Sequence, residues 1–407
     1  MLFRSRYDNG YLERAHVARR LLPAAPPTAP APRQLAPALK LTSGSIAPVA
    51  WQQLAGTSIA ARPLARRPTV SVVIPCYNYA RFLPAAVGSV AGQSGVEVQI
   101  IVIDDCSTDG SAEVAAALAA SDPRIEVRSH VRNFGHIATY NAGLAAASGE
   151  YVVVLSADDM LTPGSLARAT ALLDAHPSVG FAYGRTVTFA GPSPPLPRGR
   201  GGRWTIWRGQ DWVRARCRRG GNVIWSPELV MRTSVQRAIG DYHPGLPRTG
   251  DFEMWLRAAS VSDVGRVDNV DQAFYRLHPD SMTRTVHAGD CFQLQARHDA
   301  FAVVAQAAGL ADAQPLYDRA RRALAVTALR HACRDYHRPP VNDAAALELM
   351  AFALAMFPDA RRLVQWRSLQ WRRWLLRRWP AGPAPALEAL SRLEHRLYWR
   401  WLLWTGL

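Results

Sequence analysis

Three clusters of polar residues each follow a short apolar run, where they could bind a charged ligand. The clusters are Pro75-Cys76-Tyr77-Asn78, Asp104-Asp105-Cys106-Ser107-Thr108-Asp109-Gly110 and Ser156-Ala157-Asp158-Asp159. If the runs are parallel strands of one sheet, the clusters lie together, because ligands bind outside the carboxyl ends of such strands. Tyr77 offers an aromatic face to a nucleobase, and the Asp105 carboxylate can accept a hydrogen bond from N3–H of uracil or thymine.

The third cluster supplies two adjacent carboxylates, Asp158 and Asp159. Neighbouring carboxylates after a buried strand form a hard-oxygen site of the kind that holds Mg²⁺ or Mn²⁺ bridged to a diphosphate. Together with Tyr77 and Asp105, this pair predicts a nucleotide-diphosphate pocket. The first turn, PCYNYARF, has no G-x-G-x-x-G, so the pattern argues against a dehydrogenase.

The elements that must position these clusters alternate between short β-branched runs and Ala-rich segments. Hydrophobic periodicity predicts strands at residues 70–74, 98–103, 125–128, 151–155 and 179–183, with helices at residues 81–93, 111–120, 137–147 and 164–175. Alternation of this kind implies right-handed crossovers. The predicted fold class is therefore α/β, with a doubly wound, mostly parallel sheet.

The successive motifs resemble those of the family-2 inverting glycosyltransferases of GT-A fold. The segments that carry the resemblance are VSVVIPCYNYARFLPAAVGSVAGQS, VIDDCSTDGS, RNFGHIATYNAGLAAASGEYVVVLSADD and TGDFEMWLR. They extend over residues 68–284, about half of the chain, in the order that the family has. The resemblance implies a GT-A-like domain that takes a nucleotide-sugar donor.

The resemblance also implies a role for each residue of the donor site. Pro75 and Tyr77 would belong to the nucleotide side, with Tyr77 stacked on the base, and Asp105 would contact the base. Asp158 would contact the ribose or the sugar. Asp159 would hold the divalent metal, Mg²⁺ or Mn²⁺.

Asp251 lies where the family has its catalytic base. A carboxylate within reach of the acceptor hydroxyl suffices as a general base, but Asp251 also precedes an amphipathic segment and could simply cap that helix. Arg276 and His278 could donate to the diphosphate or could end a solvent-facing strand. Of the two acids after the second strand, Asp104 could tie down the loop, while Asp109 suits a helix N-cap.

Composition divides the chain into three parts. Residues 1–67 form a basic segment and a Pro/Ala-rich linker, residues 68–290 the GT-A-like domain, and residues 291–407 an Ala/Arg/Trp-rich helical region. Residues 344–357 predict a buried helix, and no segment has the apolar length to span a bilayer. Five widely spaced cysteines and an N-terminus without a signal-peptide pattern favour the cytoplasm.

A net charge of +16 implies an anionic partner, and the C-terminal region suggests which one. Residues 361–379 contain seven Arg, four Trp and no acid, and a second aromatic cluster comprises Tyr398, Trp399, Trp401 and Trp404. Trp beside Arg suits a helix at an anionic membrane surface. We expect peripheral attachment to the inner face of the cell membrane and no nucleic acid, with a packed terminal bundle as the alternative.

The sequence thus predicts metal-dependent, inverting transfer of a sugar from a nucleotide-diphosphate sugar, with uridine as the favoured nucleoside. The acceptor would be a saccharide or a lipid-linked hydroxyl in envelope or extracellular polysaccharide or glycolipid synthesis. Two alternatives remain. A sugar-phosphate nucleotidyltransferase would need a Gly-rich basic loop after the first strand, which PCYNYARF lacks, and a non-catalytic nucleotide-sugar-binding protein would not need both Asp159 and Asp251.

Overall fold

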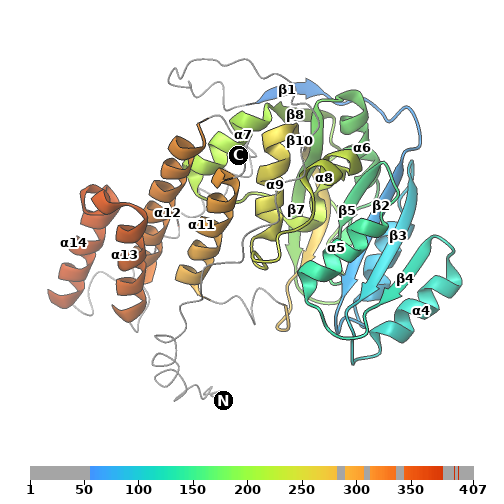
Figure 1. Cartoon of the computed structure of the whole chain (residues 1–407), viewed down its shortest axis with the longest axis horizontal. Coiled ribbons are helices and arrows are strands. Elements are labelled where there is room, and N and C mark those ends of the chain that lie inside the picture. Colours follow the sequence, from blue (N-terminus) through green and yellow to red (C-terminus); the bar gives the residue numbers. More distant parts are fainter. Residues whose placement is uncertain are drawn as a thin grey trace. The chain divides into compact units, whose positions relative to one another are not determined.

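The computed structural model describes residues 56–281, 289–306, 312–335 and 343–378, together with residues 389 and 393. The predictions for residues 1–55, and for the aromatic cluster at residues 398–404, lie outside this part of the chain. The described elements form a mixed sheet with helices on both faces, followed by four further helices (Figure 1). This architecture confirms the predicted fold class.

The sheet has the strand order β1-β8-β10-β7-β9-β5-β2-β3-β4, and β6 pairs with β10. The strands are β1 (Thr57–Ala60), β2 (Thr69–Cys76), β3 (Glu97–Asp104), β4 (Ile125–Ser129), β5 (Tyr151–Val154), β6 (Met160–Leu161), β7 (Val179–Phe189), β8 (Arg203–Trp207), β9 (Val230–Arg232) and β10 (Asp263–Arg276). Strands β5, β2, β3 and β4 are parallel, as are β7 and β10. The short β9 joins these two parallel groups by antiparallel pairing with β5 and β7.

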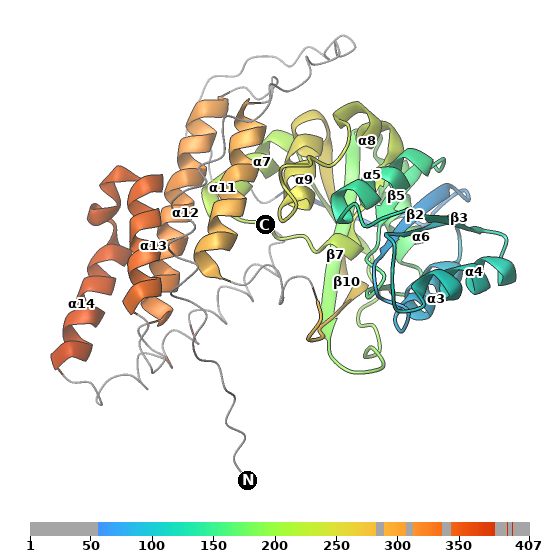
Figure 2. The same cartoon turned by 60° about the horizontal axis from the view of Figure 1, so that its bottom comes forward.

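Helices cover both faces of the sheet, which explains why its central strands are almost wholly apolar. The helices are α3 (Leu83–Ala91), α4 (Ser111–Ser121), α5 (His136–Ala146), α6 (Ser165–Ala175), α7 (Gly209–Arg219), α8 (Thr233–Ile239) and α9 (Gly250–Val261). Alternate residues of β2 enter different cores: Val72 packs with α3, α4 and α6, whereas Val73 packs with α5, α7 and α9. Figure 2 shows α5 and α8 on the side of the sheet opposite α3 and α4.

The predicted strands and helices of the first half are confirmed, with ends that differ by at most two residues except at β7, which continues to Phe189, six residues beyond the predicted end. Three features lay outside the predictions. Strand β1, which pairs with β8, falls in the segment assigned to the linker, and its exposed Thr-Ser-Ile-Ala sequence carries no apolar signal. Strand β10 extends over 14 residues, Asp263–Arg276, and β9 has only three residues.

The C-terminal region is helical, as predicted, and packs on the α/β domain. Its helices are α11 (Asp290–Gln306), α12 (Ala313–Asp335), α13 (Asp343–Met356) and α14 (Val364–Arg378). Helix α12 packs on α7 and α11 packs on α9, so the helices share one apolar core with that face of the sheet. Helix α13 confirms the helix predicted at residues 344–357, but only one of its faces is buried, through Leu349 and Phe352, while Leu347 is exposed. Within the described ranges, no helix is long and apolar enough to cross a bilayer.

Close contact between α5 and β2 generates a stability prediction. A Cβ added at Gly143 of α5 would lie 2.1 Å from Cγ1 of Val73, so Gly143→Ala must displace the helix or the valine. We expect the variant to lose about 1–3 kcal/mol of unfolding free energy in urea, as overpacked cores do.

Gly88→Ala is the matched control, because a Cβ at Gly88 of α3 would meet nothing within 4 Å. This variant should gain about 0.5–1 kcal/mol, the usual advantage of alanine over glycine within a helix. Equal effects of the two substitutions would contradict the close packing.

Candidate active site

Four of the predicted site residues meet where β5 and β10 end. Nε2 of His278 lies 3.0 Å from Oδ2 of Asp158. The main-chain N–H of Arg276 donates to Oδ1 of Asp159 at 3.0 Å, and its Nε donates to the main-chain oxygen of Asp158 at 3.1 Å. The loop after β5 is therefore fastened to the end of β10, and all four side chains are buried.

Burial and the neighbouring Asp158 make Asp159 costly to ionise. Burial, and then the charge of Asp158, raise the pKa of Asp159 well above its ordinary value. A divalent cation would favour the ionised form of both acids, and carboxylate oxygens are the donors that Mg²⁺ and Mn²⁺ prefer. Across the part of the chain that the structure covers, no three acidic, His or Cys side chains are grouped to hold a metal. The carboxylates fit a metal that takes its other oxygens from a diphosphate and water.

Tyr79 belongs to this site, although it was not among the predicted site residues, which included Tyr77. The Tyr79 ring packs edge-on against the His278 ring at 5.7 Å, and burial together with Asp158 and Asp159 raises the pKa of its hydroxyl. Tyr77 is 46% exposed beyond the end of β2, which leaves its ring face available. Pro75 is paired with Ile103 inside β2 and so contributes to the end of the strand itself.

Asp105 holds the loop that leads into α5. Its Oδ1 lies 2.8 Å from Nδ1 of His130 and accepts the N–H of Phe134 at 2.8 Å, while its Oδ2 accepts the N–H of Gly135 at 2.9 Å. The Asp104 side chain accepts the N–H of Ser107 through Oδ2 at 3.1 Å. The loop-tying role considered for Asp104 thus falls largely to Asp105, and a contact of Asp105 with a base stays a prediction.

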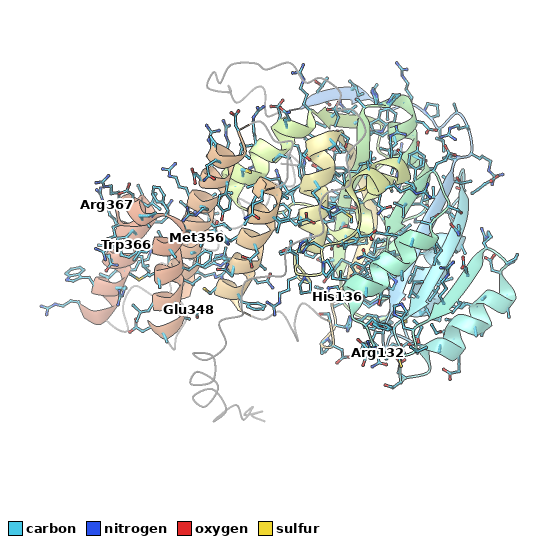
Figure 3. All side chains as sticks on the ribbon, viewed as in Figure 1. Arg132, His136, Glu348, Met356, Trp366 and Arg367 are labelled. Carbon is cyan, nitrogen blue, oxygen red and sulfur yellow. The ribbon has the colours of Figure 1, made fainter. Side chains whose placement is uncertain are left out.

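The loop held by Asp105 forms an exposed rim at the carboxyl edge of the sheet. Val131 is 91% exposed, and the guanidinium of Arg132 lies 4.8 Å from the centre of the half-exposed Phe134 ring. Figure 3 labels Arg132 and His136, the first residue of α5, in this region. The rim therefore presents a positive charge at the carboxyl edge of the sheet.

The loops after β2 and β3 are tied to each other by hydrogen bonds. The Asn78 N–H donates to Oγ of Ser107 at 2.9 Å, and Oδ1 of Asn78 accepts the N–H of Thr108 at 2.8 Å. Asp109 accepts the N–H of Ala80 at 3.0 Å. The N-cap position of α4 is occupied by Gly110 and not by Asp109, so the N-cap prediction for Asp109 is wrong by one residue.

Asp251 lies in the first turn of α9 and does not cap it, because Thr249 occupies the N-cap. Its Oδ2 instead accepts a hydrogen bond from the hydroxyl of Ser226. Burial raises the pKa of Asp251 although the hydroxyls of Ser226 and Tyr242 oppose that rise. A carboxylate with a raised pKa and a fixed orientation is suited to proton abstraction.

Tyr140 connects the two groups of carboxylates. Burial raises the pKa of its hydroxyl, and the charges of Asp251, Asp158 and Asp159 raise it further. The Tyr140 hydroxyl thus lies within electrostatic range of the carboxylate pair and of Asp251. Tyr140 is a helix residue in an Ala-rich segment, and the sequence gives no sign of this position.

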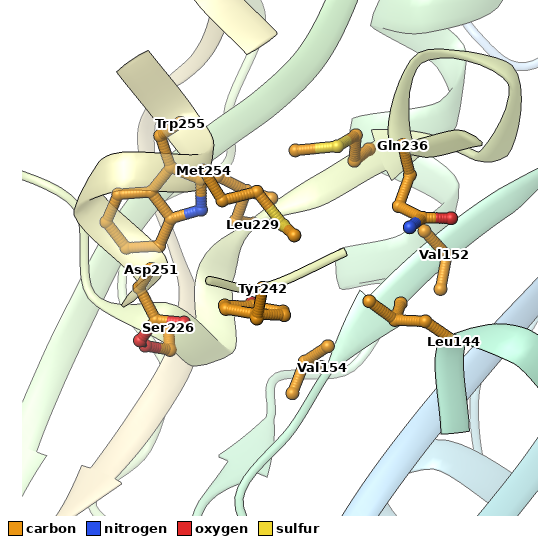
Figure 4. A pocket seen from close by; sticks show the side chains of 11 residues that line it. Leu144, Val152, Val154, Ser226, Leu229, Gln236, Tyr242, Asp251, Met254 and Trp255 are labelled. Carbon is orange, nitrogen blue, oxygen red and sulfur yellow. The ribbon is translucent and has the colours of Figure 1, made fainter. Parts of the chain in front are cut away.

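A small pocket lies beside Asp251 (Figure 4). Asp251, Ser226, Tyr242 and Gln236 supply its polar atoms, and the other lining side chains are apolar. Its free volume of about 20 Å³ has room for about one water molecule. A sugar ring does not fit there.

Glu228 fixes the turn that carries Ser226. The turn forms the 3₁₀ helix η1 (Ser226–Glu228), and Oε1 of Glu228 accepts the N–H of Trp225 at 3.2 Å. Its Oε2 accepts the hydroxyl of Thr186 on β7 at 2.6 Å. Burial raises the pKa of Glu228 to about 8. Nothing in the local sequence marks this glutamate, because its burial depends on β7 and β10.

The sheet, the carboxylates at its carboxyl edge and the covering helices define an α/β protein of the GT-A class. Residues 71–234 match the model of Glycosyl transferase family 2. The match covers the three clusters and Ser226 but ends before Asp251.

Similar proteins include curated sequences and solved structures. The succinoglycan biosynthesis protein ExoO of Rhizobium meliloti is 38% identical over 108 residues, which are 26% of this chain and 30% of that protein. The chain spans about a third of the length of the first curated relatives that it matches.

Two solved structures share the fold. TarS 1-349 of S. aureus in complex with UDP has a TM-score of 0.50 at 16% identity, covering 79% of this chain and 88% of that chain. The mannosyltransferase PcManGT of Pyrobaculum calidifontis in complex with GDP-Man and Mn²⁺ has a TM-score of 0.50 at 16% identity, covering 84% and 89%.

The buried Glu228 predicts a specific pH dependence of stability. Its pKa is near 4.5 in the unfolded chain and about 8 in the folded protein, so the folded state binds the proton more tightly. The stabilisation from the bound proton is complete below pH 4.5 and is lost as the pH rises through 8. Over that range the free energy of unfolding falls by at most about 1.4 kcal/mol per pH unit. Glu228→Gln keeps the hydrogen bonds without the titration. Urea unfolding between pH 5 and 8 should therefore give a flatter profile for the variant, and parallel profiles would contradict the assignment.

Proposed function

We propose that this protein is a metal-dependent inverting glycosyltransferase that moves a sugar from a nucleotide-diphosphate sugar to an acceptor hydroxyl. The observation that carries the proposal is the presence of two separately held carboxylate sites: the Asp158–Asp159 pair, which His278 and Arg276 contact, and Asp251, which the Ser226 hydroxyl orients. Inverting transfer needs a counter-charge for the leaving diphosphate and one general base. The two groups supply these separately.

The donor side of the reaction falls to the carboxylate pair and its partners. Asp159 would hold the metal, which neutralises the charge that develops on the departing diphosphate. Asp158, fixed by His278, would orient the ribose or the sugar. Arg276 and His278 would donate charge-assisted hydrogen bonds toward the diphosphate. Pro75, Tyr77 and Asp105 would form the nucleotide end of the donor site.

The acceptor side falls to Asp251. Its Oδ2 is oriented by the Ser226 hydroxyl, and its pKa is raised by burial, so it would take the proton of the attacking hydroxyl. The proton passes to the carboxylate as the new bond to the anomeric carbon forms. Inversion follows when the hydroxyl attacks from the face opposite the leaving diphosphate.

The relatives support the choice of substrates. TarS was solved with UDP and PcManGT with GDP-Man and Mn²⁺, and ExoO is a succinoglycan biosynthesis protein. We propose a uridine diphosphate sugar as donor, and a saccharide or lipid-linked acceptor in envelope or extracellular polysaccharide or glycolipid synthesis. A sugar-phosphate nucleotidyltransferase and a non-catalytic nucleotide-sugar-binding protein are the alternatives.

The proposal also includes the division of the chain into three parts. We propose that residues 68–290 form the transferase domain, that residues 1–67 precede it as a separate basic segment, and that residues 291–407 serve attachment. Strand β1 then acts as an edge addition to the domain, since it pairs only with β8.

A crossed pair of variants tests the proposed chemistry. Asp159→Ala should abolish Mn²⁺-dependent binding of UDP, because the diphosphate loses its counter-charge, as titration calorimetry would measure. Asp251→Asn should retain UDP binding but lower turnover of the UDP-sugar by about 10² or more, since the neutral amide cannot take the proton.

The binding and turnover results also distinguish the proposed transferase from the two alternative functions. A wild-type protein that binds a nucleotide sugar but turns over none would be the binding protein. Pyrophosphate-dependent release of a nucleoside triphosphate would identify the nucleotidyltransferase. Wild-type UDP affinity in Asp159→Ala would remove this residue from the metal site.

We also propose that α14 attaches the protein peripherally to the cytoplasmic face of the membrane. The exposed side chains of α14 recur every three or four residues and form the α14 stripe, which consists of Val364, Arg367, Trp371, Trp374 and Arg378. The opposite face contacts α12 through the fully buried Leu369. Half of each of the two stripe indoles is exposed among guanidinium groups, as at an anionic membrane surface.

The packed face of α14 determines which variants test this attachment. Truncation before residue 361 would remove Leu363 and Leu369 from the core, so surface substitutions are the cleaner choice. Trp371→Ala/Trp374→Ala and Arg362→Gln/Arg367→Gln should each lower binding to phosphatidylglycerol vesicles at least about tenfold in co-sedimentation.

Salt should weaken only the part of vesicle binding that the arginines contribute, because exposed charges are screened. Arg62→Gln/Arg67→Gln, a pair of exposed arginines before β2, is the charge-matched control and should bind as the wild type does. Full-length protein that stays in the supernatant at low salt would refute the attachment.

A further inference from the structure

Trp225 is an exposed indole in a domain whose other described indoles are buried. It is 39% exposed, whereas the remaining tryptophans of the α/β domain are at most 2% exposed: Trp204, Trp207, Trp212 and Trp255. Its ring packs against the Tyr275 ring with centres 4.7 Å apart and planes at 56°. An indole left 39% exposed, in a domain that buries its other described indoles, points to a surface that a ligand covers.

The position of Trp225 is fixed by buried groups. Its main-chain N–H donates to Oε1 of Glu228, which is itself buried and accepts a hydrogen bond from the hydroxyl of Thr186 of β7. Tyr275 lies on β10, paired with Thr188 of β7. The aromatic pair is therefore held from both sides by the sheet, as a preorganised binding surface requires.

The aromatic pair spans the two reacting groups of the proposed transferase. Ser226, the residue after Trp225, donates to Asp251, and Arg276, the residue after Tyr275, donates its N–H to Asp159. An acceptor hydroxyl must reach the base and the anomeric carbon at the same time. The ring that carries the hydroxyl consequently lies next to Trp225 and Tyr275, and the small pocket beside Asp251 cannot hold it.

We propose that Trp225, supported by Tyr275, is the platform on which the acceptor saccharide stacks. This inference rests on the proposed transferase and specifies its acceptor: a pyranose with an apolar face of axial C–H groups, bound beside the base. An aromatic face buries such a surface, while hydroxyls at the ring edge remain free for Asp251. A lipid carrier then lies beyond the ring that stacks on Trp225.

Saturation-transfer NMR with methyl β-D-glucopyranoside, methyl β-D-galactopyranoside and methyl N-acetyl-β-D-glucosaminide, in the presence of UDP and Mn²⁺, tests the platform. In the wild type we expect saturation at the ring C–H protons of at least one glycoside. Trp225→Ala should lower the affinity for that glycoside at least tenfold. Trp225→Phe should restore the affinity to within about threefold of the wild-type value. Leu347→Ala, an exposed apolar residue of α13, is the control and should match the wild type.

Calorimetry with UDP and Mn²⁺ on the same variants separates acceptor from donor. The proposal expects unchanged UDP affinity in Trp225→Ala. It is overturned if glycoside binding is unaffected, if UDP affinity falls in parallel, or if no glycoside binds the wild type. Failure of the proposed function gives a different result: glycosides bind and depend on Trp225, but no nucleotide sugar is bound or consumed.

Discussion

The hydrogen bonds of Arg276 hold the candidate site together. Its main-chain N–H donates to the Asp159 carboxylate, and its guanidinium donates to the main-chain oxygen of Asp158 and, at 2.8 Å, of Gly191. The guanidinium also lies over the rings of Phe82 and Phe189. Without these contacts, the negative charges of the two adjacent carboxylates would repel each other, and their burial in the apolar core would be unfavourable. One residue thus fastens the loops after β5 and β7 to the end of β10.

Much of this arrangement follows from local sequence. Strands β2, β3 and β5 are β-branched runs that each end at a polar cluster, so the position of Asp158 and Asp159 at the sheet edge was predictable. The role of Asp105 was less so. Its hydrogen bonds to His130, Phe134 and Gly135 depend on a loop 25 to 30 residues away, and an acid pair does not reveal which member turns toward that loop.

The features that sequence reasoning missed depend on contacts between distant segments. Arg276 and Asp159 are 117 residues apart, and the register of β10 against β6 and β7 decides that they meet. Glu228 looks like an ordinary surface acid until β7 covers it. Trp225 reads as one more aromatic in a chain with 13 tryptophans. Its exposure is a property of the folded surface, which no local pattern encodes.

Strand β9 gives the domain an internal joint. Only three residues long, it pairs with β5 on one side and β7 on the other, and η1 with its Trp225 and Ser226 enters directly from its amino end. The chain before this joint, from the end of α7 at Arg219, can change length without altering the register of any parallel strand. Sheet order and the Asp158–Asp159 pair are thereby insulated from changes in the segment beside Asp251. In the proposed transferase, such insulation would let one scaffold evolve new acceptor preferences while its nucleotide chemistry stays constant.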